Sequence, residues 1–302
     1  MSQTTTPQLP PTVSESKVKG TSPWAIGMRK FFKNKLAVTS LLFLIIMFAV
    51  SFSADLLDTH DPTKVDIMSI NEAPSKDHYL GTDEGGRDVY TRLLHGGQVS
   101  LTIGLSITVL VIITGTIFGS IAGYFGGWVD SLVMRFTDYV LTLPFLVFVI
   151  VVKAIFVDTG VLTLIFVVSL LSWGGTARMV RGKILSEKEN EYVLSAISIG
   201  CKPSKVIFKH LLPNVISTII VQSVYLLAAM IVIETALSFL GFGVPANIPS
   251  WGNIMSTAST PEVIEQQWWI WVPAGLCITS TILAINFVGE GLKDAFNPKS
   301  LR

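Results

Sequence analysis

The sequence predicts an all-α polytopic membrane protein with six transmembrane helices. Half of its 302 residues are hydrophobic and only 14% are charged, whereas a soluble domain carries about 25% charged residues. The mean hydropathy is +0.59, and the hydrophobic residues gather in runs of about 20, the length that an α-helix needs to cross a bilayer. The net charge of +1 gives no indication of a nucleic-acid partner, and none is expected.

The N-terminal part of the chain predicts a tail, a surface helix and a first span. Residues 1–23 are rich in Thr, Pro, Ser and Lys without apolar periodicity, which is typical of a disordered segment. The stretch WAIGMRKFFKNK, residues 24–35, predicts a short amphipathic helix on the membrane surface. The apolar run that ends at Ala54 predicts the first transmembrane helix, so the helices together occupy residues 24–54. A signal peptide is the alternative, but a long region precedes the run and further apolar spans follow it.

Five more apolar runs predict the remaining transmembrane helices. They are rich in Leu, Ile, Val and Phe, and they lie near residues 98–123, 131–153, 160–178, 213–240 and 269–289. Few charged residues interrupt them, so each satisfies the length and composition of a membrane span.

The distribution of Lys and Arg predicts the orientation, because cytoplasmic loops are enriched in these residues. Six lie in residues 1–35, seven in 178–210 and three in 293–302. Segment 241–268 has none, and segment 55–97 has four against nine Asp and Glu. We therefore expect both termini and 178–210 in the cytoplasm, with 55–97 and 241–268 as extracytoplasmic segments.

The polar segment between the fourth and fifth spans predicts a helix–turn–helix outside the bilayer. In a helix over residues 191–199 (EYVLSAISI), one apolar face consists of Tyr192, Val193, Ala196 and Ile197. Gly200 follows, where a helix C-terminus favours a residue with positive φ. Pro203 is suited to the first turn of a second helix that ends at Pro213. The apolar face packs either on this chain's own helix ends or in the groove of a soluble partner.

The same segment resembles the cytoplasmic signature of ABC importer permeases. That signature reads E-A-A, three residues, Gly, nine residues, and then I-x-L-P. In this chain Leu194, Ser195 and Ala196 occupy the first three positions, Gly200, Leu212 and Pro213 match, and His210 stands at the Ile position. The match is therefore recognisable but has departures at Leu194, Ser195 and His210.

Two further stretches make the resemblance specific. HYLGTDEGGRDVYTRLLHGGQVSLTIGL, residues 78–105, is similar to the segment that leads into the second span of oligopeptide, dipeptide and nickel permeases. ETALSFLGFGVPANIPSWGNIM, residues 234–255, resembles the end of their fifth span, and GEGLKDAFNP, residues 289–298, resembles their tail. The resemblance covers roughly residues 24–302 and points to the C-type subunit of these transporters.

The resemblance implies the fold of a type I ABC importer transmembrane domain, with its core at 98–292, a coupling loop at 186–212 and a cytoplasmic tail at 293–302. It implies a permease that passes oligopeptides or dipeptides through the bacterial inner membrane. Import of nickel or another small ligand is an alternative, and so is a secondary transporter that acts alone. The implied partners are a homologous second permease subunit, two cytoplasmic ATP-binding subunits and an extracytoplasmic peptide-binding protein, within membrane lipid.

The helix at 191–199 is then a coupling helix. The residues expected to transmit motion from an ATP-binding subunit are Tyr192, Val193, Ser195, Ala196, Ile197, Gly200 and Pro213. Lys188 is expected on the solvated flank of the same loop.

No residue is expected to perform bond chemistry, and neither a cofactor nor a metal is expected. The motif GxxxxGK[ST] is absent from the sequence, so ATP hydrolysis belongs to other chains. The acids Asp83, Glu84 and Asp88 near His78 match no calcium or zinc pattern, and we expect them to serve as helix caps and surface charges.

Polar residues inside the predicted spans are candidates for function by default. Glu234 and Asp138 are expected to accept hydrogen bonds from neighbouring helices or, for Asp138, to pair with Arg135; proton or substrate handling is the alternative. Gly115, Gly119 and Gly123 form a small-xxx-small pattern that predicts close packing between helices.

Overall fold

The computed structural model describes residues 23–156 and 160–296. Apart from an isolated bridge between Thr82 and Asp88, these residues form helices and loops, which confirms the all-α fold. Residues 1–22 of the predicted tail at 1–23 and residues 297–302 of the predicted C-terminal tail lie outside the described residues, and Pro23 is the first residue of α1.

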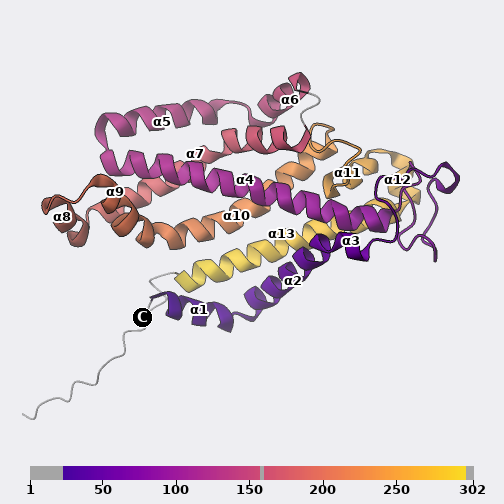
Figure 1. Cartoon of the computed structure of the whole chain (residues 1–302), viewed down its shortest axis with the longest axis horizontal. Coiled ribbons are helices and arrows are strands. Elements are labelled where there is room, and N and C mark those ends of the chain that lie inside the picture. Colours follow the sequence, from indigo (N-terminus) through magenta and orange to yellow (C-terminus); the bar gives the residue numbers. More distant parts are fainter. Residues whose placement is uncertain (1–22, 157–159, 297–302) are drawn as a thin grey trace, which may run out of the picture.

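Within residues 23–156 and 160–296, five helices are long and apolar enough to cross a membrane. Figure 1 shows them side by side: α2 (Lys35–Phe52), α4 (Val89–Phe125), α7 (Gly160–Lys188), α10 (Leu212–Phe239) and α13 (Trp268–Phe296). Each matches one of the predicted apolar runs, although α2 and α10 end one or two residues before theirs. Helices α4, α7 and α13 extend well beyond their runs, to 37, 29 and 29 residues. A sixth crossing exists only if two shorter helices are counted as one span.

The third predicted span, 131–153, is not a single helix. It is divided into α5 (Gly127–Thr142) and α6 (Phe145–Ile155), which meet at 78°. The cause is Pro144, because a proline lacks the N–H of a helical hydrogen bond and disfavours helical geometry in the residue before it. Leu143 is accordingly extended and ends α5. The 11 residues of α6 reach only about 17 Å, which is short of a bilayer core of about 30 Å.

Helices α4 and α7 pack closely along their length. A Cβ atom added at Gly119 would lie 2.5 Å from the carbonyl oxygen of Ala177, and one at Gly115 would lie 2.6 Å from the Cβ of Thr176. Small residues at this spacing therefore bring the two backbones together, as the sequence pattern predicts. A cluster of buried Ile, Val and Leu side chains continues the contact on both helices.

A second group of helices lies along the other side of α4. Helix α13 packs against α2 and α10, and their buried side chains form one apolar cluster with Phe31 of α1 (Pro23–Lys33). The predicted amphipathic helix is therefore present as α1, and it lies against the end of α13. Phe31 is only 3% exposed, whereas its neighbour Phe32 is 60% exposed.

Short helices and loops gather at the two opposite ends of the bundle (Figure 1). At one end lies the connection of residues 189–211, which we call the α8 loop; it contains α8 (Glu191–Ser198), α9 (Pro203–Val206) and η2 (Ile207–Leu211). At the other end lies what we call the cap, residues 53–88 and 240–267. The cap contains α3 (Ala54–Leu57), η1 (Ile67–Ser69), α11 (Trp251–Ser256), η3 (Thr257–Ser259) and α12 (Pro261–Gln266).

Candidate functional site

Helix α8 has a well-defined C-terminal end. Gly200 takes a φ of +80°, its N–H donates to the carbonyl of Ile197, and the N–H of Cys201 donates to the carbonyl of Ala196. This pair of hydrogen bonds is a Schellman motif, which requires the left-handed conformation that glycine adopts without strain. The positive φ predicted at Gly200 is therefore confirmed, and the chain turns sharply after one helix of eight residues.

The second half of the α8 loop is continuous with α10. Pro203 occupies the first turn of α9, as predicted. The helix does not stop at Pro213, however, because α9, η2 and α10 follow one another without an interruption. Residues Ile207–Leu211 form a π-helical turn, a distortion that lets the chain pass a proline, which cannot donate to the carbonyl four residues before it.

The α8 loop rests on an apolar cluster of this chain. Val193 is completely buried and Ala196 is 6% exposed. Val193 shares its cluster with Val180 and Ile184 of α7 and with residues of η2 and α10. Two of the residues expected to enter a partner's groove therefore face inward and fix α8 to its own bundle.

The remaining predicted coupling residues are accessible. Tyr192 is 42% and Ile197 is 37% exposed, and Ser195, Gly200 and Pro213 are exposed as well. The sequence pattern missed three further apolar side chains on this loop that are exposed to solvent: Leu194, Ile199 and Phe208. The outward surface of the α8 loop is thus more apolar than its charged flanks suggest.

Hydrogen bonds tie α8 to the helices on both sides of it. The hydroxyl of Tyr192 donates to Glu187 at 2.9 Å and accepts from the Asn214 side chain at 2.8 Å. These bonds connect α8 to the end of α7 and to the first turn of α10. Burial, with the carboxylate of Glu187 nearby, raises the pKa of Tyr192 above its usual value, so this hydroxyl keeps its proton at neutral pH.

Two charged side chains near this end, Lys188 and Asp138, differ from the sequence expectations. Lys188 is not on a solvated flank, because its ammonium donates to the carbonyl of Tyr124 at 2.6 Å and lies over that ring. Asp138 pairs with Arg178 of α7 rather than with Arg135. The partner stands 40 residues away in sequence, so spacing along one helix could not reveal it. An analogous pair joins Arg181 to Asp130, so two ion pairs connect α7 to α5.

Glu234 is fully buried where α10 meets the cap. It accepts a hydrogen bond from Ser238 at 2.9 Å, and the hydroxyls of Ser100, Ser250 and Thr235 lie beside the same carboxyl group. Ser238 and Ser100 in turn accept backbone N–H groups of the 240–251 segment. The carboxyl group thus serves as a hydrogen-bond acceptor at the centre of a hydroxyl network.

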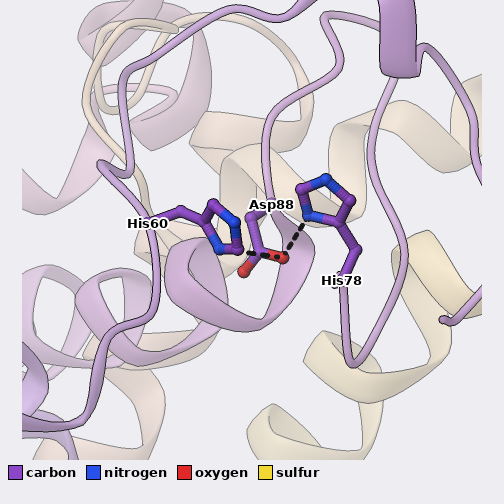
Figure 2. A group of neighbouring side chains, drawn as sticks. All are labelled: His60, His78 and Asp88. Atoms are coloured by element: carbon purple, nitrogen blue, oxygen red, sulfur yellow. Dashed lines mark hydrogen bonds and ion pairs between the residues drawn. The ribbon is translucent and has the colours of Figure 1, made fainter. Parts of the chain in front are cut away.

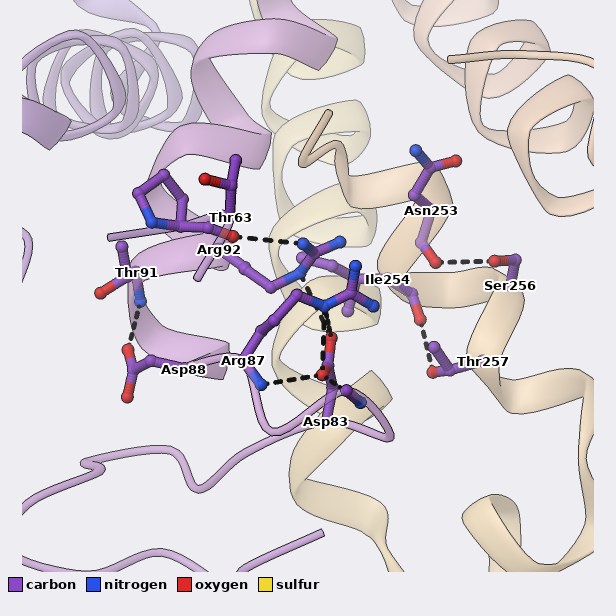
Figure 3. A network of polar contacts seen from close by, with 12 residues as sticks. Thr63, Asp83, Arg87, Asp88, Thr91, Arg92, Asn253, Ile254, Ser256 and Thr257 are labelled. Atoms are coloured by element: carbon purple, nitrogen blue, oxygen red, sulfur yellow. Dashed lines mark hydrogen bonds and ion pairs between the residues drawn. The ribbon is translucent and has the colours of Figure 1, made fainter. Parts of the chain in front are cut away.

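A cavity of about 660 Å³ opens beside this network. Its charged lining consists of Asp83, Arg87 and Arg92 from the cap and the start of α4, together with Lys153 of α6. Figure 3 shows both guanidinium groups directed at the single carboxylate of Asp83, with Nε–Oδ2 distances of 2.9 Å for Arg87 and 3.4 Å for Arg92. Three cations against one anion leave the cavity with an excess of positive charge.

The acids of the 83–88 segment have separate roles. Asp83 is only 4% exposed, and beyond the arginines its Oδ1 accepts the N–H groups of Gly85 and Arg87. Asp88 caps α4 by accepting the N–H of Thr91 at 2.7 Å, which confirms the predicted cap. Glu84 is exposed, as a surface charge is expected to be.

Comparisons with known proteins agree with this architecture. Residues 115–302 match the family model described as binding-protein-dependent transport system inner membrane component. Residues 22–74 match the N-terminal TM domain of oligopeptide transport permease C.

Individual relatives are similar over nearly the whole chain. The oligopeptide transport system permease protein OppC of Bacillus subtilis is 36% identical, over 93% of this chain and 91% of the relative. The dipeptide transport system permease protein DppC of the same organism is 38% identical, over 91% of this chain and 85% of the relative. OppC of Lactococcus lactis subsp. lactis is 37% identical, over 86% of this chain and 90% of the relative.

Proposed function

This chain belongs to the family of binding-protein-dependent transport system inner membrane components, and from this premise we propose that it forms part of the path by which peptides are imported. It is a membrane-spanning permease subunit of an ABC importer, not an enzyme, and the ATPase is a separate subunit. Oligopeptides or dipeptides are the proposed ligands, because the relatives at 36–38% identity carry those names.

The observation that carries the mechanism is the exposed apolar surface of the α8 loop. Leu194 and Ile197 are 49% and 37% exposed and lie one helical turn apart, the spacing with which a helix fills a groove. We infer that this surface docks on an ATP-binding subunit. Because Val193 is buried on the bundle and Tyr192 is hydrogen-bonded to α7 and α10, movement of α8 is transmitted to both helices.

The proposed assembly contains a homologous second permease subunit, two cytoplasmic ATP-binding subunits and an external peptide-binding protein. The α8 loop faces the cytoplasm and the cap faces outward, in line with the seven Lys and Arg of segment 178–210 against none in 241–268. Both termini face the cytoplasm in this arrangement. The crowding of α1, α8 and the end of α13 toward one end of the bundle supports it (Figure 1).

Reconstitution tests the transport function. The chain would be placed in liposomes with its permease, ATPase and binding-protein partners, and uptake of radiolabelled dipeptides, longer peptides and nickel would be measured with and without internal ATP. We expect ATP-dependent peptide uptake that disappears when the ATP-binding subunits are left out. Uptake of nickel alone, or peptide uptake by this chain alone along an ion gradient, would contradict the proposal.

Labelling tests the orientation. With Cys201 and Cys277 replaced, a single cysteine introduced at Ser186 should react only from the cytoplasmic side, and one introduced at Asn247 only from outside. Reaction of both positions from the same side would overturn the six-crossing arrangement.

A further inference from the structure

The cap brings together two histidines and an aspartate that are far apart in sequence. His60 lies in the segment after α3, His78 lies in a loop, and Asp88 lies at the N-cap of α4. Figure 2 shows the three side chains converging, with His78 Nδ1 2.9 Å and His60 Nδ1 3.9 Å from the same Oδ2 atom of Asp88. One ligand atom from each residue lies within 4.8 Å of the other two.

We propose that His60, His78 and Asp88 bind a divalent transition-metal ion, with Zn²⁺ the ion that suits them best. Two imidazole nitrogens and one carboxylate oxygen are the donor set of three-ligand zinc sites, in which water fills the fourth position. Ca²⁺ and Mg²⁺ are disfavoured because they require mainly oxygen ligands. Donors around a tetrahedral ion at about 2.0–2.2 Å lie roughly 3.3–3.6 Å apart, between the two distances that separate Asp88 from the histidines.

The carboxylate of Asp88 is already oriented for this role. Its Oδ1 is held by the N–H of Thr91, so Oδ2 is the atom directed at both rings. The side chain is nearly inaccessible, at 1% exposure. A ligand fixed in place by a second hydrogen bond is the usual arrangement at metal sites.

A cap contact without a metal accounts for only part of the geometry. A hydrogen bond between His78 and Asp88 explains that pair, but His60 at 3.9 Å is beyond hydrogen-bond distance from the carboxylate. The rings of His60 and His78 are nevertheless 4.7 Å apart at their centres. The hydroxyl of Thr59 contacts His60 Nδ1 at 2.9 Å, so metal binding through this atom requires Thr59 to turn away.

The charges nearby favour a cation. Segment 55–97 holds nine acidic residues against four basic ones, and Arg87 and Arg92 are both engaged with Asp83. The ion would tie residues 60, 78 and 88 together and so hold a segment with little regular structure against the start of α4.

A second group of potential ligands supplies a control. Asp55, Asp58 and His95 also lie close together, but this group has one imidazole and the Asp55 side chain is 81% exposed. Replacement of His95, which lies in α4 beside the cap, therefore removes a nearby histidine without touching the proposed site.

The test is zinc binding by the full-length chain, purified in detergent with an affinity tag that contains no histidine. After treatment with a chelator, the chain is dialysed against Zn²⁺ and its metal content is measured, with Co²⁺ absorption as an independent report of nitrogen and oxygen ligation. We expect one Zn²⁺ per chain. The substitutions His60→Ala and His78→Ala should each weaken binding about tenfold or more, and His95→Ala should leave it unchanged.

Proteolysis of the cap separates metal binding from the folding of the variants. Zn²⁺ should slow cleavage within residues 58–88 in the unaltered chain and in His95→Ala, but not in His60→Ala, which loses no hydrogen bond to Asp88. The proposal is wrong if the unaltered chain binds no Zn²⁺ at micromolar concentrations. It is also wrong if His60→Ala and His78→Ala bind as the unaltered chain does, or if His95→Ala alone abolishes binding.

Discussion

The α8 loop and the cap both connect long helices, but different kinds of contact stabilise them. The α8 loop rests on an apolar cluster around Val193 and presents Leu194 and Ile197 to solvent. The cap instead buries the carboxylate of Asp83 between two arginines, and it covers Glu234 of α10, which lies among serine and threonine hydroxyls.

The difference indicates what each region does. Buried charges and hydroxyls demand definite partners, because a polar group without one is costly in a low-dielectric interior; the cap therefore has a specified shape around its cavity. The α8 loop is held by apolar packing, which requires close contact but no specific partner atom. Its exposed apolar surface remains available to another protein. This contrast fits our proposal that the α8 loop is moved by a partner, whereas the cap holds a fixed shape around its cavity.

The largest effect is expected from removing the anion of the cap. Asp83→Ala leaves Arg92, whose side chain is 5% exposed, beside Arg87 without a carboxylate, and breaking such a buried pair costs about 3–5 kcal/mol. We expect a strongly lowered midpoint of thermal unfolding for the purified chain. Glu84→Ala, at the exposed neighbouring position, is the control and should unfold as the unaltered chain does. Equal midpoints for both variants would mean that buried charge does not hold the cap.

A smaller effect is expected at the turn of the α8 loop. A Cβ atom at Gly200 meets no neighbour within 4 Å, so Gly200→Val acts only through its φ of +80°, at a cost of about 1–2 kcal/mol. Amide hydrogen exchange in residues 191–201 should become about 5–30 times faster. Gly200→Asn should change it much less, since asparagine tolerates this conformation. Equal rates for Val and Asn would exclude the Schellman turn as the cause.

The smallest effect is expected from the tether between α8 and its neighbours. Tyr192→Phe removes the hydrogen bonds to Glu187 and Asn214, at a cost of about 0.5–1.5 kcal/mol. Because the pKa of Tyr192 is raised from 10.0, the advantage of tyrosine should be constant below pH 10 and should fall as the pH rises through the raised pKa. Amide hydrogen exchange of α8 in the unaltered chain and in Tyr192→Phe, at pH 7 and above pH 10, would measure this stabilisation. A stabilisation that persists after Tyr192 is deprotonated would contradict the proposed role of its hydrogen bonds.

The helices could largely be predicted from the sequence because each apolar run reaches about the length of a membrane span. The break at Pro144 was missed, because transmembrane helices tolerate proline and composition does not distinguish a straight span from a bent pair. Gly200 and Pro203 were predicted correctly because their backbone requirements are local.

Contacts between distant residues could not be predicted in the same way. The helical spacing of Val193 and Ala196 is compatible with burial either in this chain or in a partner. Only the fold shows that both side chains face inward. Asp138 forms an ion pair with Arg178 of another helix, and His60 lies close to Asp88, which is 28 residues away in sequence. Which residues bind the ATP-binding subunit remains a proposal. Because Ala196 is buried, Ala196→Glu is expected to disturb the α8 loop itself.

The most direct test of the central claim is co-purification of the ATP-binding subunits with variants of the exposed α8 surface. Leu194→Glu and Ile197→Glu place a charge where a partner's groove would bury it, which costs several kcal/mol, and each 1.4 kcal/mol is about tenfold in affinity. Ser186→Glu adds the same charge at an exposed position at the end of α7 and serves as the control. All three proteins should reach the membrane and unfold at the same temperature. We predict that the first two lose the ATP-binding subunits and peptide uptake while Ser186→Glu keeps both; full retention in Leu194→Glu and Ile197→Glu would contradict the account.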